Sequence, residues 1–205
     1  MTYILNNPDV IIRLTGQHLY MTLTALVISL AIALPLSLLL LRSERLANGV
    51  LGLLGVLYTI PSIALLILLL PVFGLNQRSV VVALIIYTQV ILVRNMVVGM
   101  KEVPAYILEA AKGVGMSTWQ RWRRVQLPLA MPVIIAGLRI ATIVAIGIAT
   151  IGAKFGAGGL GTLLFDGIAQ NRYDKIVAGS LVVVLVAILL NRLLITTERY
   201  YQKPV

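Results

Sequence analysis

Side chains able to carry out acid–base, nucleophilic or metal chemistry are few in this sequence. His18 is the single histidine and cysteine is absent, so neither a thiolate metal site nor a disulfide can form. The carboxylates all lie outside the long apolar segments described below, and they are Asp9, Glu44, Glu102, Glu109, Asp166, Asp174 and Glu198. A proton-driven carrier usually needs an acid inside the membrane. We therefore predict no catalytic residue, no metal site and no proton-coupled mechanism, and we interpret His18 as a polar residue at the membrane interface.

Residues 156–161 read GAGGLG, which formally satisfies the G-x-G-x-x-G pattern of dinucleotide-binding loops. That pattern binds pyrophosphate between a strand and a helix, whereas here it follows a long apolar segment. Glycine-rich backbone at a membrane boundary is tolerated where protein covers it or where water fills a cavity. We interpret residues 152–161 as a tightly packed turn near a pathway, with an ordinary flexible loop as the alternative.

The elements that must hold these residues are membrane helices. Hydrophobic residues make up 60% of the 205 residues and charged residues 12%, a balance typical of membrane proteins. Apolar runs near the roughly 20 residues that cross a bilayer occur at 19–41, 50–72, 79–100, 129–151 and 176–195. Strand alternation is not visible. The sequence predicts an all-α integral membrane fold with five transmembrane helices in a single domain, 1–205, and no cleaved signal peptide.

The distribution of positive charge predicts the topology. One side of the membrane receives ten Lys and Arg residues, namely Arg42, Arg45, Lys101, Lys112, Arg121, Arg123, Arg124, Arg192, Arg199 and Lys203. The other side receives Arg13, Arg78, Lys154, Arg172 and Lys175. The excess places the N-terminus outside, and the C-terminus and the loop 101–128 in the cytoplasm. This bias accounts for the net charge of +10, so no nucleic-acid partner is predicted.

Two arginines, Arg94 and Arg139, fall within the runs at 79–100 and 129–151. Both lie toward the cytoplasmic ends of their helices, where the side chain can reach the interface. A role in a substrate path or a subunit contact is the alternative. Pro61, in the segment YTIPSIALL, bends its helix either for static packing or as part of a moving element.

The loop 101–128 is the long polar stretch of the chain. Pro104 suits the first residue of a short helix, which we expect to end where Gly113 and Gly115 offer left-handed stops. Ser117 and Gln120 have the spacing of a capping box for a second helix. Trp119, Trp122 and Val125 recur on one face of that helix, a pattern that suits the membrane–water interface.

The loop resembles a known motif. Glu109, Ala110 and Ala111, followed at fixed spacing by Gly115, Val125, Leu127 and Pro128, are similar to the EAA loop of permease subunits in bacterial ATP-binding-cassette importers, which usually have isoleucine at the position of Val125. Residues 59–66, 92–100, 127–139 and 156–161 resemble the osmoprotectant branch, which imports glycine betaine, choline or carnitine. Lys154 departs from that branch.

The resemblance implies a type I importer subunit with a methionine-permease-like fold in the bacterial cell membrane. The expected partners are a second permease chain, two cytoplasmic ATPases that bind ATP and magnesium, an extracytoplasmic substrate-binding protein that meets residues 152–175, and membrane lipid. The chain itself has no G-x-x-x-x-G-K-[ST] loop, so we expect no cofactor in it and no enzymatic activity. The alternatives are an importer of an amino acid or another small solute, and an ATP-independent channel or carrier.

Two groups of functional residues follow from this resemblance. The expected ATPase-coupling residues are Glu109, Ala110, Ala111, Gly113, Gly115, Met116, Val125, Leu127 and Pro128. The candidates for a substrate pathway or gate are Tyr58, Pro61, Ser62, Tyr87, Asn95, Gly156, Gly158, Gly159 and Gly161. For the two tyrosines, packing at the membrane interface is the alternative.

Overall fold

The computed structural model describes residues 2–202, and every regular element in that range is a helix. The chain order is α1 Thr2–Asn6, α2 Pro8–Leu40, α3 Glu44–Thr59, α4 Ser62–Phe73, α5 Gln77–Lys101, α6 Ala105–Gly113, α7 Thr118–Arg121, the π-helix η1 Trp122–Gln126, α8 Leu127–Gly152, the 3₁₀-helix η2 Ala153–Phe155, α9 Gly161–Ala169 and α10 Tyr173–Gln202. The predicted all-α fold is confirmed.

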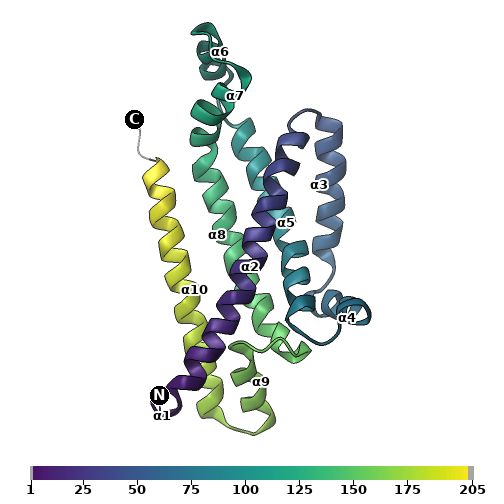
Figure 1. The fold of residues 1–205 in the computed structure, drawn as a ribbon, viewed down its shortest axis with the longest axis vertical. Coiled ribbons are helices and arrows are strands. Elements are labelled where there is room, and N and C mark those ends of the chain that lie inside the picture. The colour runs from purple at the N-terminus through teal and green to yellow at the C-terminus, as the bar shows by residue number, and fades with distance from the viewer. Residues whose placement is uncertain (1, 203–205) are drawn as a thin grey trace.

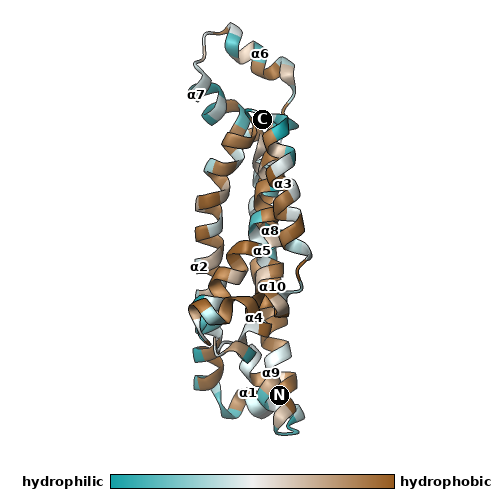
Figure 2. Cartoon of the chain, turned by 90° about the vertical axis from the view of Figure 1, so that its right-hand side faces the viewer, coloured by the Kyte–Doolittle hydropathy of each residue, from teal (hydrophilic) through white to brown (hydrophobic). Residues whose placement is uncertain are grey.

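The molecule is an elongated bundle with two distinct ends (Figure 1). The α6 end carries α6 and α7, and the long helix α10 runs toward it; the α9 end carries α1, α4 and α9 (Figure 1). Hydrophobic residues run along the long helices, and hydrophilic residues gather in α7 and near the two ends (Figure 2). This pattern suits a bundle whose middle lies in hydrocarbon.

Four helical segments are long and apolar enough to cross a membrane, at Pro8–Leu40, Gln77–Lys101, Thr118–Phe155 and Tyr173–Tyr201. They contain the predicted spans 19–41, 79–100, 129–151 and 176–195 almost completely. A fifth candidate consists of α3 and α4, which meet at an angle of 95°. The described chain therefore has four or five spans, depending on whether this bent pair counts as one.

The predicted span 50–72 is interrupted at Pro61, where the sequence predicted a bend. Ile60 and Pro61 both have extended backbone, with ψ of 126° and 136°, and separate α3 from α4. The ring of a proline crowds the residue before it out of the helical region, and Pro61 cannot donate a main-chain hydrogen bond. The direction change is therefore dictated by the Ile60–Pro61 step, while its angle depends on what α4 packs against.

Helix α5 is the centre of the bundle, because it packs against α2, α3, α4 and α8. Small residues allow α8 to approach it closely: a Cβ added at Gly137 would lie 2.4 Å from the Cβ of Asn95, and one at Gly152 would lie 2.6 Å from Val80. Close approach of backbones is the usual basis of helix association in membranes. The α5–α8 pair is therefore the tightest part of the scaffold.

Buried polar groups join α2 to α5. The hydroxyls of Ser29 and Thr88 are 2.7 Å apart, and the Nε2 of Gln89 donates to the carbonyl of Ser29 over 3.1 Å. Ser29 and Thr88 have no exposed surface. In hydrocarbon such interhelical hydrogen bonds fix how two helices are rotated against each other.

Candidate functional site

The loop 101–128 forms a projection at the α6 end of the molecule (Figure 1). Helix α6 begins at Ala105 and is preceded by Pro104, which has the extended backbone of an N-cap residue. The helix therefore begins one residue later than predicted. Tyr106 is 71% exposed and Val114 is 77% exposed. Both side chains are therefore open to solvent or to a partner, at opposite ends of α6.

The turn after α6 depends on one glycine rather than two. Gly115 has φ +83°, and its N–H donates to the carbonyl of Lys112 over 3.0 Å. Met116 N–H reaches back to the carbonyl of Ala111 over 3.1 Å, so the end of α6 is closed by hydrogen bonds to its last turn. Gly113 is the last residue of the helix and does not have positive φ, so the predicted left-handed stop there is wrong.

The capping box of α7 is confirmed. The side chain of Ser117 accepts from the N–H of Gln120 over 3.3 Å, and the side chain of Gln120 accepts from the N–H of Ser117 over 2.8 Å. These two bonds satisfy main-chain donors that no helix carbonyl can reach. They anchor the beginning of the second short helix.

The second short helix then changes type. Residues Trp122–Gln126 form a π-helix, in which the N–H of Leu127 donates to the carbonyl of Trp122, five positions earlier. Pro128 follows in the first turn of α8, where it has no N–H to donate. The regular three-residue spacing of Trp119, Trp122 and Val125 is therefore interrupted, although the two indoles do stack, with ring centroids 4.7 Å apart.

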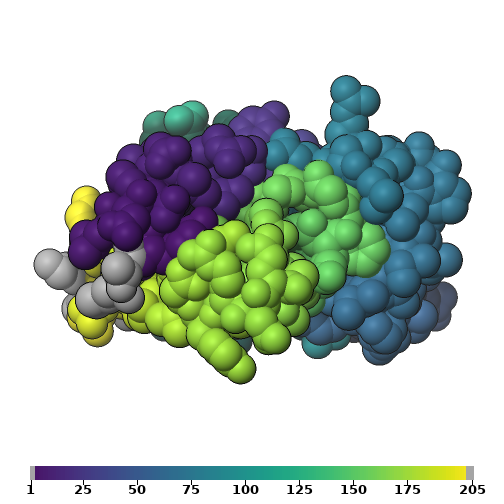
Figure 3. Space-filling view, turned by 90° about the horizontal axis from the view of Figure 1, so that it is seen from below, coloured from purple at the N-terminus to yellow at the C-terminus, as the bar shows by residue number. Residues whose placement is uncertain are grey.

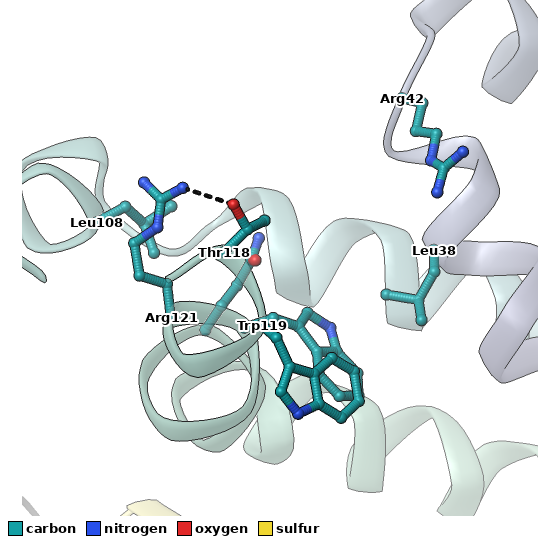
Figure 4. A pocket seen from close by; sticks show the side chains of 8 residues that line it. Leu38, Arg42, Leu108, Thr118, Trp119 and Arg121 are labelled. Carbon is teal, nitrogen blue, oxygen red and sulfur yellow. Dashed lines mark hydrogen bonds between the residues drawn. The ribbon is translucent and has the colours of Figure 1, made fainter. Parts of the chain in front are cut away.

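A cavity of about 590 Å³ lies where this loop meets the end of α2 (Figure 4). Its lining comes from α2, α6, α7 and η1, and consists of Leu38, Arg42, Leu108, Thr118, Trp119, Arg121, Trp122 and Gln126. Arg121 donates to the hydroxyl of Thr118 over 3.3 Å, and Gln126 donates to the carbonyl of Met100 over 3.2 Å. The second bond ties η1 to the end of α5.

The residues predicted to couple to an ATPase all lie on this projection or at its base. Exposed members are Glu109, Ala110, Gly113, Gly115 and Pro128, and partly or fully buried members are Ala111, Met116, Val125 and Leu127. The exposed side of α6 thus carries small and polar residues beside Tyr106, and α6 contacts α7 and η1.

Four of the predicted pathway residues come together where α3 meets α4. The rings of Tyr58 and Tyr87 are 5.6 Å apart in an edge-to-face arrangement at 68°, and the hydroxyl of Tyr87 donates to the carbonyl of Ile60. Pro61 and Ser62 form the turn itself. Tyr87 is only 5% exposed, whereas Tyr58 is 42% exposed. Tyr87 is therefore a packing residue, and Tyr58 is the one available to a solute.

The glycine-rich turn precedes α9, and its Ala157 belongs to the same buried hydrophobic cluster as Tyr87. Gly156, Gly158 and Gly159 have φ of +74°, +74° and +78°, and the N–H of Gly159 donates to the side chain of Gln17 over 3.0 Å. A Cβ at Gly161 would lie 1.9 Å from the carbonyl oxygen of Thr150. The turn is tightly packed because neither the backbone angles nor the space allow a side chain.

Seen from the α9 end, the start of α2, the segment around α9 and the α4–α5 connection lie side by side (Figure 3). A cavity of about 980 Å³ opens between them. Its polar lining is Gln17, Thr24, Asn76, Gln77 and Arg78, and its aromatic lining is Tyr20 and Phe73. His18 is fully buried under the turn, so the protein covers its side chain; its location at the membrane interface stays a prediction.

Asn95, the remaining pathway candidate, does not join either group. Its Nδ2 donates to the carbonyl of Ile91 over 2.8 Å, and its side chain packs on Gly137 of α8.

Sequence reasoning missed Gln17, which holds the glycine turn, and Glu198, whose carboxylate lies 3.2 Å from Arg139. The partners of both are distant in sequence, so spacing carried no signal. Within residues 2–202 no cluster of His, Cys, Asp or Glu is able to hold a metal ion.

Comparison with known proteins gives consistent matches over nearly the whole chain. A family model described as "Binding-protein-dependent transport system inner membrane component" matches residues 17–203. The glycine betaine/carnitine/choline transport system permease protein OpuCB of Bacillus subtilis is 37% identical over 199 residues, covering 97% of this chain and 92% of that protein. The osmoprotectant import permease protein OsmW of Salmonella typhimurium is 40% identical over 197 residues, covering 94% and 92%.

The fold also matches solved structures. An inward-facing MetNI methionine ABC transporter chain superimposes with a TM-score of 0.86 at 22% identity, covering 97% of this chain and 99% of that chain. An amino acid ABC transporter bound to histidines gives a TM-score of 0.79 at 20% identity, covering 97% of both chains. At these identities the likeness concerns the fold, which is that of a type I importer permease.

Proposed function

Because the chain belongs to the family of binding-protein-dependent transport system inner membrane components, a family of multi-pass membrane proteins, we propose that it is a permease subunit of an ATP-driven osmoprotectant importer. Glycine betaine, carnitine and choline are the substrates named for its relatives. The observation that carries the proposal is that relatives with these names match at 34–40% identity along 93–97% of the chain.

The proposed assembly has two permease chains, two ATPases that bind ATP and magnesium, and an extracytoplasmic binding protein. We propose that residues 1–205 form one transmembrane domain with its α6 end in the cytoplasm, so that the N-terminus is outside and the C-terminus inside. The basic residues Lys112, Arg121, Arg123 and Arg124 at the α6 end support this orientation. The glycine turn and α9, at the opposite end, would then face the binding protein.

Coupling would begin at the exposed face of α6, around Glu109 and Ala110, in a cleft of the ATPase. The tight turn at Gly115 and the capping box at Ser117 make α6 and α7 move together. Motion would pass through η1 into α8, and from α8 to α5 through the close contacts at Gly99 and Gly137. A π-helix between the loop and α8 supports this route, because such segments mark places where a helix adjusts its register.

The gate would lie at the α3–α4 break and at the glycine turn, where predicted pathway residues border the bundle. Alternating access then requires two states of the bundle whose populations ATP binding and hydrolysis shift. A break at Pro61 supports such a role because α4 can change its angle without disrupting α3.

The direct test is uptake into proteoliposomes that contain this permease, its ATPase and its binding protein. Radiolabelled glycine betaine, carnitine and choline would be supplied on the binding-protein side, and ATP on the ATPase side. We expect at least one of the three compounds to accumulate, and this accumulation should require both ATP and the binding protein. Uptake that proceeds without ATP would instead identify a channel or carrier. Amino acids supplied in a parallel assay would identify a different importer if they alone were taken up.

A further inference from the structure

One stripe of the central helix α5 is not covered by the rest of the chain. Arg94 and Val98 are exposed and Ile91 is partly exposed, although 61% of the most apolar part of α5 is buried. Positions three and four apart share one helix face, so these side chains form a continuous stripe. The other faces of α5 contact α2, α3, α4 and α8.

Arg94 lies inside the membrane-spanning part of α5. It is seven residues from Lys101, the last residue of the helix, which corresponds to about 10 Å along the axis. Its Cα–Cβ bond tilts toward the beginning of α5, as in every α-helix, and therefore away from the nearer end of the span. A cation at this depth normally pairs with another group or lines the route of a solute or ion.

Two of the carboxylates at this end of the bundle have other partners, and the other two, Glu102 and Glu109, are exposed and form no ion pair with Arg94. Glu44 lies 3.4 Å from Lys101, and Glu198 lies 3.2 Å from Arg139. Within residues 2–202 the guanidinium of Arg94 has neither an ion pair nor a side-chain hydrogen bond. Arg94 is thus an exposed cation on an otherwise apolar stripe, a poor surface for lipid and a suitable one for a polar solute.

We propose that the stripe of Ile91, Arg94 and Val98 lines the translocation path, and that Arg94 binds the carboxylate of a trimethylammonium carboxylate such as glycine betaine or carnitine. This inference rests on the proposed function and narrows its substrate class. A guanidinium offers a planar pair of donors that matches a carboxylate. Choline has the trimethylammonium group but no carboxylate, so Arg94 repels it and selects the zwitterions.

The tyrosine pair supplies the complementary contact. Tyr87 lies seven residues before Arg94 and therefore on the same face of α5, and the exposed ring beside it is Tyr58. An aromatic face attracts a quaternary ammonium group, which all three compounds share. A solute that follows this face meets an aromatic ring before it meets the arginine. Tyr58 therefore serves all three substrates, whereas Arg94 serves only those with a carboxylate.

The test compares three substrates in the reconstituted importer with its ATPase and binding protein. Arg94→Gln is expected to lower the uptake of glycine betaine and carnitine by roughly tenfold or more, as expected for one lost charged hydrogen-bonding partner, while choline uptake is unchanged or increased. Arg94→Lys keeps the charge and should retain part of the uptake of the two zwitterions. Tyr58→Ala should lower the uptake of all three.

Arg139→Gln is the matched control, because it removes an arginine from a neighbouring helix that is already paired with Glu198. Any effect of that change should be equal for the three substrates. An equal loss of all three with Arg94→Gln, or no loss of any, would overturn the inference while leaving the importer function intact. A wild-type complex that transports none of the three would overturn the proposed function and the inference with it.

Discussion

The hydroxyl of Tyr87 on α5 donates a hydrogen bond to the carbonyl of Ile60, the residue that follows α3 where the chain turns by 95° into α4. Pro61 cannot donate a hydrogen bond, so the chain is interrupted there in any case. The tyrosine satisfies the carbonyl that the break leaves without a helical donor. The angle between the two helices is thereby linked to the central helix of the bundle.

Tyr87→Phe is expected to lower stability by about 1 kcal/mol, because a partly buried carbonyl loses its donor. Thermal unfolding of the purified complex in detergent would measure the change. Tyr58→Phe is the matched control, since the hydroxyl of Tyr58 has no hydrogen-bond partner in the part of the chain that the structure describes. If the two substitutions have the same effect, the break is held by ring packing and not by the hydrogen bond.

Gly115→Val should weaken the attachment of the ATPase while the permease still inserts into the membrane. Gly115 has φ +83°, and an added Cβ there would meet nothing within 4 Å, so the cost comes from the backbone and not from crowding. A β-branched residue is strained in that region by about 1–3 kcal/mol. The measurement is the amount of ATPase that co-purifies with the permease.

Gly115→Asn distinguishes a loss caused by the turn geometry from a loss caused by side-chain bulk, because asparagine tolerates the left-handed region. The turn hypothesis expects Asn to retain most of the ATPase and Val to lose it. Equal loss with both residues would show that bulk against the ATPase matters and that the turn geometry does not.

Gly161→Ala should destabilise the glycine turn strongly. The new Cβ would lie 1.9 Å from the carbonyl oxygen of Thr150, and backbone atoms on both sides must move to relieve this overlap. Overpacking of this kind costs about 1–3 kcal/mol or more. Gly147→Ala is the control on α8, with no atom within 4 Å of the added Cβ. Limited proteolysis and thermal unfolding should detect the first change and not the second.

The ion pair between Arg139 and Glu198 should contribute more than the pair between Lys101 and Glu44. The two N–O distances are similar, at 3.2 and 3.4 Å, but the side chains are 30% and 14% exposed in the first pair and 43% and 87% exposed in the second. Double-mutant cycles with neutral isosteres are expected to give about 1–2 kcal/mol for the first and below about 0.5 kcal/mol for the second. Equal coupling energies would show that burial does not set the difference.

The sequence predicted what depends on local patterns. The long apolar runs gave the positions of the spans, and Ser117 and Gln120 gave the capping box, because both signals lie within a few residues. The position of the break at Pro61 could be predicted, but the angle between α3 and α4 could not, since that angle depends on Tyr87, 26 residues beyond Pro61. The π-helix could not be predicted because two features coincide there. Pro128 has no N–H to donate, and the N–H of Leu127 donates to the carbonyl of Trp122, five residues earlier.

The contacts between distant segments could not be predicted from spacing. Ser29 and Thr88 are 59 residues apart in the chain, and Gln17 and Gly159 are 142 residues apart. The position of Arg94 within a span was visible in the sequence, but its exposure was not. That property depends on which faces of α5 the neighbouring helices cover.

The proposed coupling requires that α6 docks on an ATPase. The chain contains no cysteine, so a single cysteine can be placed at Tyr106, which is 71% exposed on α6, or at Val72, which is 74% exposed near the α9 end. The measurement is cross-linking to the ATPase by a short thiol-reactive reagent in a complex that still transports substrate. We expect a cross-link from Tyr106→Cys and none from Val72→Cys; the absence of one from Tyr106→Cys, or equal cross-linking from both, would contradict the account.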